Sequence, residues 1–183
     1  MTRKTPEKRS SPEKYNLCLM RHGVAAERAD REGPLEDAKR PLTPEGKLKL
    51  KAIARGLEAI GVEFDWVVTS PLKRAVETGE VVAESIAAEA PRDHCEALAP
   101  GSGSAQEVID FLSQRRDRTR VLLVGHEPDL SGLASELVGA GRSAQLAFKK
   151  GACCLISFDG FPSQSPGQLS WWLTPRILRK LSS

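Results

Sequence analysis

Short apolar runs alternate along the chain with longer amphipathic segments. The runs at residues 15–20, 65–70 and 120–125 are apolar almost throughout, which predicts central parallel strands that are buried on both faces. Two further runs, at residues 153–159 and 168–174, predict an antiparallel hairpin at the edge of the same sheet. The alternation of strands and helices predicts a single α/β domain with a mostly parallel sheet.

Capping residues and helical spacing locate the predicted helices. Thr43 is the N-cap candidate of the first, with Pro44 at its first helical position and Gly61 at its end. Its apolar residues at helical spacing are Leu48, Ile53, Leu57 and Ile60. Further helices are predicted over residues 71–88 with Pro71 in the first turn, over 105–114 with Ser104 as cap, and over 129–138. The charged stretch 24–40 predicts a long surface loop, and residues 95–99 a short extended segment.

Composition and charge restrict the class of protein. The chain has 183 residues, 40% hydrophobic and 28% charged, which is ordinary for one globular domain. Residues 1–14 carry five Lys and Arg without apolar periodicity, so we expect a basic flexible tail there and a single domain over 15–183. Such a tail could contact nucleic acid or lipid, but we favour a solvated terminus and expect neither as a partner. The tail has no apolar core typical of a secretory signal.

The cysteines indicate a reducing compartment. Cys18, Cys95, Cys153 and Cys154 include no CxxC pair, and a bridge between the two adjacent ones would be strained. We therefore expect small buried hydrophobes in a cytoplasmic protein, with no metal site.

Polar residues follow three of the predicted strands at the point where each ends. Arg21, His22 and Gly23 follow the first, Ser70 follows the second with Arg74 shortly after it, and His126 follows the third. Ligands collect beyond the carboxyl ends of parallel strands, so these segments should meet in one cleft. Guanidinium groups and helix N-termini favour a phosphoryl group, and a neutral imidazole can accept one covalently.

The stretches "LMRHG", "SPLKRAVETGE" and "VGHEPDL" resemble, in this order, the motifs of the histidine phosphatase superfamily, also called the phosphoglycerate mutase-like family. The resemblance covers about residues 15–140. It implies a three-layer α/β/α sandwich and an enzyme without cofactors. It also implies that His22 is the nucleophile, that Arg21 and Arg74 hold the phosphoryl oxygens, and that His126 completes the pocket for phosphate.

Two features indicate a branch of the family. About fifty residues separate Arg74 from His126, too few for the large helical cap insert of the mutase and phytase branches. The stretches "AKRPLTPEG" and "LSWWLTP" are similar to the SixA subfamily of bacterial phosphohistidine phosphatases, which act on histidine-phosphotransfer domains. That resemblance makes Arg40 a further phosphate contact. It implies a monomeric, metal-independent phosphatase that acts on a phosphorylated signalling protein.

The wider family has a glutamate general acid after the second motif, and this chain has "EALAP" there, with Leu98, Ala99 and Pro100 at the expected place. An alkoxide leaving group needs such an acid, whereas the protonated imidazole of a phosphohistidine leaves more readily. The departure favours a P–N substrate. Two alternatives stay open: a phosphatase of a small phosphorylated metabolite with Glu96 as the acid, and a phosphate-binding module without turnover.

Residues close to these motifs, and the tryptophans, also have expected roles. Gly23 is expected to let the backbone turn sharply towards the phosphoryl group. Glu127 is expected either to orient His126 or to cap the next helix. Lys73 and His94 are expected to be solvated surface residues. We expect the tryptophans to pack in the core and at the sheet edge, and a protein-docking rim stays open as the alternative; they are Trp66, Trp171 and Trp172.

Overall fold

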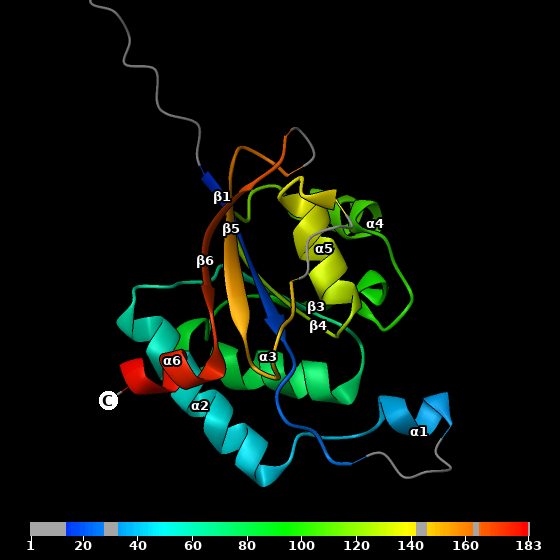
Figure 1. Ribbon diagram of the computed structural model, residues 1–183, viewed down its shortest axis with the longest axis vertical. Helices are drawn as coiled ribbons and strands as arrows, with labels where there is room; N and C mark the ends of the chain where they lie inside the picture. The colour runs from blue at the N-terminus through cyan, green and yellow to red at the C-terminus, as the bar shows by residue number, and fades with distance from the viewer. Residues whose placement is uncertain (1–13, 28–32, 142–145, 163–164, 183) are drawn as a thin grey trace, which may run out of the picture.

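A six-stranded mixed sheet forms the centre of the molecule, in the order β3-β2-β4-β1-β5-β6 (Figure 1). The computed structural model describes residues 14–27, 33–141, 146–162 and 165–182; the predicted tail lies outside them except for Lys14, which begins β1. The strands are β1 (Lys14–Arg21), β2 (Trp66–Thr69), β3 (Arg92–His94), β4 (Arg120–Gly125), β5 (Cys153–Asp159) and β6 (Gln168–Leu173).

The strand pairing confirms the mostly parallel sheet and the hairpin at its edge. β1 pairs in parallel with β4, β4 with β2, and β2 with β3, whereas β1–β5 and β5–β6 are antiparallel. β1 and β4 are therefore central, and their carboxyl ends meet in register, with Arg21 opposite Gly125.

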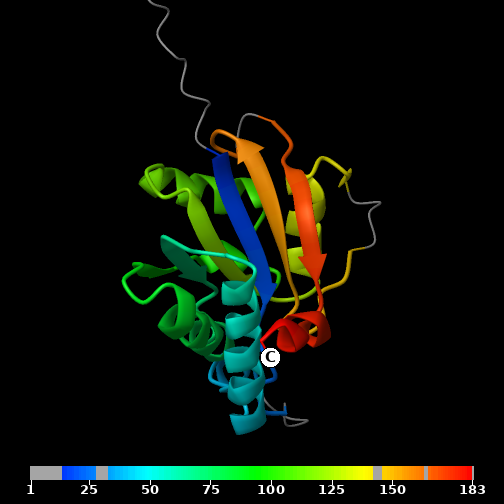
Figure 2. The same ribbon diagram turned by 90° about the vertical axis from the view of Figure 1, so that its left-hand side faces the viewer.

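Helices cover both faces of the sheet, which makes the predicted three-layer sandwich. One face packs against α4 (Ala105–Leu112) and α5 (Asp129–Leu137). The other packs against α2 (Pro44–Ala59), α3 (Lys73–Ile86) and α6 (Pro175–Leu181), as Figures 1 and 2 show from two sides. Alternate residues of each strand serve the two cores: Leu17 and Leu19 face the first, Cys18 and Met20 the second.

Helix α2 has the predicted N-cap, and its buried face contains part of the predicted apolar set. Thr43 Oγ1 accepts the N–H of Gly46 at 2.9 Å, and Pro44 is the first helical residue. Leu48, expected inside, is 68% exposed, and Ile60 is also exposed, while Leu50 is buried. Ile53 and Leu57 of the predicted set are buried against the sheet, and Leu50 completes this face in place of Leu48 and Ile60.

Other expectations shift by a few residues. The predicted loop 24–40 contains a short helix, α1 (Pro34–Ala38). The extended segment expected at 95–99 lies earlier, as β3, and is followed by the 3₁₀ turn η1 (Glu96–Leu98). Pro71 precedes α3 rather than lying in its first turn. Ser104 caps α4 through a capping box with Glu107, as its sequence position predicted.

All of the cysteines are buried free thiols. Burial raises the pKa of the Cys95 and Cys154 thiols, so both stay protonated and behave as small hydrophobes. Within the described residues, no helix is long and apolar enough to cross a membrane.

Candidate active site

The ends of β1, β2 and β4 bring His22, Ser70 and His126 together. The N–H of His22 donates to the carbonyl of Gly125 at 3.1 Å, and the N–H of Ser70 donates to that of Val124 at 2.9 Å. These bonds extend the parallel pairing by one residue beyond each strand. The polar residues therefore meet at the edge of the sheet where the sequence predicted a cleft.

His22 is held as a neutral ring with one free nitrogen. Its side chain is 6% exposed, and its Nδ1 lies 2.7 Å from the carbonyl oxygen of Gly23. A carbonyl can only accept, so Nδ1 carries the proton and Nε2 keeps its lone pair. Burial is the main cause that lowers the pKa of His22 to about 4. The hydrogen bond to Gly23 raises this pKa, and the charges of Arg74, Arg21 and Lys150 lower it further. At neutral pH, Nε2 is thus a free base.

His126 lies against His22, with 4.9 Å between the ring centroids. Its Nε2 is 2.8 Å from Ser70 Oγ, which also accepts the N–H of Leu72. Which of these two atoms donates depends on the tautomer of the neutral His126 ring, since Ser70 Oγ can donate one proton and accept two. Burial, followed by the neighbouring His22, lowers the pKa of His126 to about 3. The other ring nitrogen, Nδ1, is buried and has no hydrogen-bond partner among the described residues.

Arg21 and Arg74 each leave a buried donor unpaired. Arg21 donates from Nη1 to the carbonyl of Phe148 at 2.7 Å, and Arg74 donates from Nη1 and Nη2 to Asp37. The Nε atoms of both arginines and Nδ1 of His126 are among the five buried side-chain N and O atoms without a hydrogen-bond partner in the described part of the chain. Unpaired buried donors cost roughly 1–3 kcal/mol each. The charges of both arginines act on His22 and His126, and their two free Nε–H groups suit a ligand with several acceptor oxygens.

Arg40 reaches this cluster through Asp37 and not by a free guanidinium. Its Nε and Nη2 contact Asp37 Oδ1 at 2.8 and 2.7 Å, and its Nη1 donates to the carbonyl of Ala26 at 2.6 Å. The other carboxylate oxygen of Asp37 is 3.1 Å from Arg74 Nη2. Burial alone would raise the pKa of Asp37, but the charges of Arg74 and Arg40 lower it. Asp37 is a carboxylate between two arginines, and the sequence analysis did not identify it.

Glu127 has neither of the two roles expected for it. Its carboxylate accepts the N–H of Phe148 at 2.9 Å and the hydroxyl of Ser131 at 2.6 and 2.8 Å. Phe148 in turn accepts from Arg21, so Glu127 fixes the backbone that holds Arg21. The first helical turn of α5 has no side-chain cap.

Gly23 is required for space and not for a sharp turn. Its backbone is outside the set of positive-φ glycines, and an added Cβ would lie 2.6 Å from Leu50 Cδ1. Its N–H donates to Thr78 Oγ1 at 3.0 Å, and Thr78 donates to the carbonyl of Arg74 at 2.6 Å. Thr78 therefore links the His22 segment to α3. The "SPLKRAVETGE" motif contains Thr78, but its position in the sequence gave no sign of the bond to Gly23, 55 residues earlier in the chain.

The place of the expected general acid is apolar. Leu98 and Ala99 are buried, whereas Glu96 is exposed and has no hydrogen bond or ion pair to the cluster within the described residues. A cavity of about 370 Å³ opens beside His126, and Leu98 lines it while Glu96 does not. Its carboxylates come instead from Asp129, which accepts the N–H of Gly101, and from Glu136.

The remaining candidates lie outside the cluster. Lys73 is exposed, and His94 is exposed with Nδ1 3.0 Å from Thr69 Oγ1, in accord with surface positions. Trp66 is 1% exposed and stacks on Phe111, so it belongs to the core. Trp172 packs on Phe148, with 4.1 Å between ring centroids. In the part of the chain that the structure describes, no three His, Cys, Asp or Glu side chains are grouped to hold a metal ion.

Comparisons with known proteins agree with this geometry. The family model of the histidine phosphatase superfamily (branch 1) matches residues 17–100. An uncharacterised protein of Picosynechococcus sp. is 35% identical over 136 residues, which cover 73% of this chain and 79% of that protein. The structure is similar to that of the protein histidine phosphatase SixA complexed with tungstate, with a TM-score of 0.75, 27% identity, and coverage of 89% of this chain and 99% of that one.

The phosphoglycerate mutase from Bacillus anthracis shares the fold at 14% identity, with a TM-score of 0.68 and coverage of 94% of this chain and 99% of that chain. This likeness, together with the sheet described above, confirms the phosphoglycerate mutase-like fold without a large cap insert.

Proposed function

The chain belongs to the histidine phosphatase superfamily, and within it we propose that this protein is a phosphohistidine phosphatase that works through a phosphorylated His22. The observation that carries the proposal is the environment of His22: a neutral ring with Nδ1–H on a carbonyl, close to Arg21 and Arg74, whose buried Nε–H groups have no partner among the described residues. Membership of the family and likeness to a protein histidine phosphatase support phosphatase activity in general. The phosphohistidine substrate is the finer part of the proposal.

In the first step, the lone pair of His22 Nε2 attacks phosphorus and the substrate P–N bond breaks. The leaving imidazole departs as a neutral ring when its other nitrogen carries a proton. His22 then bears the phosphoryl group on Nε2 and a proton on Nδ1, so the ring is cationic, and the Gly23 carbonyl at 2.7 Å stabilises it.

The phosphoryl oxygens are held by the unpaired donors. We propose that Nε–H of Arg21, Nε–H of Arg74 and His126, in the tautomer that carries its proton on Nδ1, donate to the charge that spreads over these oxygens in the transition state. The arginines supply positive charge, so we propose turnover without a divalent ion. Arg40 acts through Asp37 on the position of Arg74 in this scheme, and Asp37 moves aside or shares Arg74 when the ligand binds.

In the second step, water attacks the phosphorus of phospho-His22 and the Nε2–P bond breaks. Inorganic phosphate leaves, and the neutral ring is restored. Because the ring is already cationic, neither step needs a carboxylic acid to protonate an alkoxide. The apolar Leu98 and Ala99 at the place of the family acid are consistent with a P–N substrate.

The test compares two substrates on the same enzyme. We expect phosphoramidate and a phosphohistidine peptide to be hydrolysed with kcat/KM at least about a hundredfold above that for a sugar phosphate, because an unassisted alkoxide is the poorer leaving group. A quench in alkali should trap a phosphoenzyme that is stable to base and labile to acid, and His22→Ala should abolish it.

The other outcomes identify the alternatives. Fast cleavage of the sugar phosphate alone, lost in Glu96→Gln, would replace this proposal with a metabolite phosphatase. Tight phosphate binding without turnover of any substrate would indicate a binding module.

A further inference from the structure

A second, strongly basic cavity lies directly behind the nucleophile. It has a volume of about 330 Å³ and is lined by residues of the N-terminal part of α2, by α6 and by the segment 149–151. Gly23 and Val24, which follow His22 in the chain, line its wall. We call this cavity the basic groove. Its cationic lining residues are Lys49, Lys149, Lys150, Arg176 and Arg179.

Among the described residues, Glu45 offsets part of the positive charge of the basic groove, because it pairs with Lys49 and its charge also acts on Arg179. No carboxylate occurs among its described lining residues. Within the described part of the chain, Lys49 alone of the five cations has an ion pair, with the exposed Glu45 at 2.5 Å. Lys149, Lys150 and Arg176 are exposed without such a partner. Clustered like charges are unfavourable by themselves, and a ligand that carries negative charge relieves them.

The floor of the basic groove is apolar. Leu50 and Ile53 of α2 are buried beneath it, and Pro175 of α6 closes one side. Cationic stems over an apolar floor fit acidic side chains interspersed with aliphatic ones. The described lining contains no aromatic side chain, and base stacking on aromatic rings is what single-stranded nucleic acid uses. The surface therefore suits an acidic polypeptide better than a nucleic acid.

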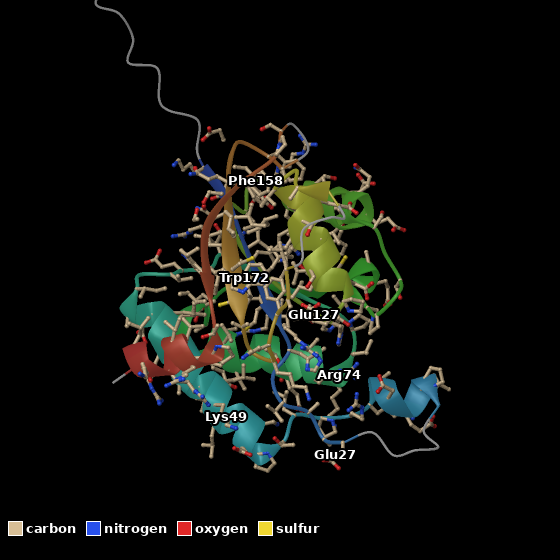
Figure 3. The ribbon with its side chains drawn as sticks, in the orientation of Figure 1. Glu27, Lys49, Arg74, Glu127, Phe158 and Trp172 are labelled. Atoms are coloured by element: carbon tan, nitrogen blue, oxygen red, sulfur yellow. The ribbon has the colours of Figure 1, made fainter. Side chains whose placement is uncertain are left out.

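The basic groove adjoins the active site, because Gly23 and Val24 directly follow His22 and line the groove. The N–H of Gly151 donates to the carbonyl of Arg21 and the N–H of Arg21 donates to Ala152, each at 3.1 Å, which fixes the lysine-bearing segment to the end of β1. The charge of Lys150 contributes to lowering the pKa of His22. Figure 3 shows Lys49 on α2 at the same end of the molecule as Arg74.

We propose that the basic groove binds an acidic segment of the phosphorylated protein substrate, next to the phosphohistidine that His22 attacks. This inference rests on the proposed function, because it assumes a polypeptide that carries the phosphoryl group. It assigns selectivity to Arg176 and Arg179, which are outside the catalytic cluster. The groove acts on substrate binding and leaves the chemical step as it is.

The test uses two phosphohistidine peptides of equal length, flanked by glutamates in one and by glutamines in the other. At low salt we expect the wild-type kcat/KM to be about fivefold higher for the glutamate peptide, the size expected for a few exposed charge pairs. The preference should fall towards unity in about 0.5 M salt, where charges are screened within several ångströms.

The variant Arg176→Gln/Arg179→Gln should lose the preference and keep its rate on the glutamine peptide. The matched control is Lys51→Gln/Arg55→Gln, which removes the same charge from exposed positions of α2 outside the groove. It should keep the preference. Equal wild-type rates on both peptides, or a preference that survives in the groove variant, would overturn the proposal.

Binding of a fluorescent hexaglutamate peptide to the full chain separates this inference from the proposed function. If only the sugar phosphate is cleaved, the proposed function fails. Whatever the substrate test shows, the groove assignment fails if hexaglutamate does not bind the wild-type chain, or if it binds equally to the groove variant. Displacement of hexaglutamate by a single-stranded oligonucleotide at much lower concentration than by unlabelled hexaglutamate would overturn the choice of an acidic polypeptide.

Discussion

Replacing Thr78 with valine tests whether α3 positions the nucleophile through one hydroxyl. Thr78 is fully buried, and its Oγ1 accepts the N–H of Gly23 at 3.0 Å and donates to the carbonyl of Arg74 at 2.6 Å. The carbonyl of Gly23 in turn orients His22 Nδ1. A change at Thr78 should therefore be felt at His22, although the two side chains belong to different elements.

The magnitude follows from the groups left unpaired. Valine keeps the volume of Thr78 but removes the acceptor for the buried N–H of Gly23, which costs about 1–3 kcal/mol of unfolding free energy. Thr78→Ser is the matched control, since it keeps the hydroxyl and loses a buried methyl group at a cost of about 1 kcal/mol. The two variants thus lose comparable stability for different reasons.

Urea denaturation and steady-state hydrolysis of phosphoramidate distinguish these reasons. We expect kcat/KM to fall about tenfold or more in Thr78→Val, because small displacements of a catalytic group are costly, and to stay within about twofold in Thr78→Ser. Equal activity of the two variants would refute the argument that this hydroxyl positions His22. Equal activity with unequal stability would show that Thr78 only supports the fold.

Three further predictions concern pH, Arg21 and metal ions. The free energy of unfolding should rise from pH 4 to pH 6.5, because burial lowers the pKa of His22 from 6.5 to about 4 and the unfolded chain binds more protons in that window; urea midpoints at pH 4.5 and 7 measure this, and a slope that is unchanged in His22→Asn contradicts it. Glu127→Gln weakens a charged hydrogen bond to Phe148 and should raise the KM for phosphoramidate about tenfold, whereas the exposed Glu136→Gln should not; an unchanged KM would mean that Arg21 is positioned without Glu127. Dialysis against EDTA should leave turnover unaltered, because Arg21 and Arg74 supply the positive charge, and activity that is lost and then restored by a metal ion would contradict that charge source.

The order of elements along the chain was predictable because it follows from local pattern. Apolar runs placed β1, β2 and β4 within a residue or two, and Thr43 and Ser104 placed the starts of two helices. The buried face of α2 was not predictable by spacing alone. Two apolar stripes are available on that helix, and contact with the sheet and α6 selects the one that contains Leu50 over the one that contains Leu48.

The candidate site likewise contains residues that the sequence predicted and residues that it did not. The residues that end strands could be listed in advance because parallel strands bring their carboxyl ends to one edge. The residues that hold them could not, because Asp37, Thr78 and Glu127 act through contacts across 37, 55 and 21 residues of chain. Short-range pattern contains no information on such partners.

The sequence by itself determined an α/β sandwich of this family and a cluster of four residues: His22, Arg21, Arg74 and His126. Hydrophobic periodicity and the order of motifs are read directly along the chain, so neither needs the tertiary structure. The tertiary structure alone decided which nitrogen of His22 is free, which donors of the cluster remain unpaired and where the basic groove lies. Those properties depend on burial and on the direction of individual hydrogen bonds, and both are set only when distant segments pack together.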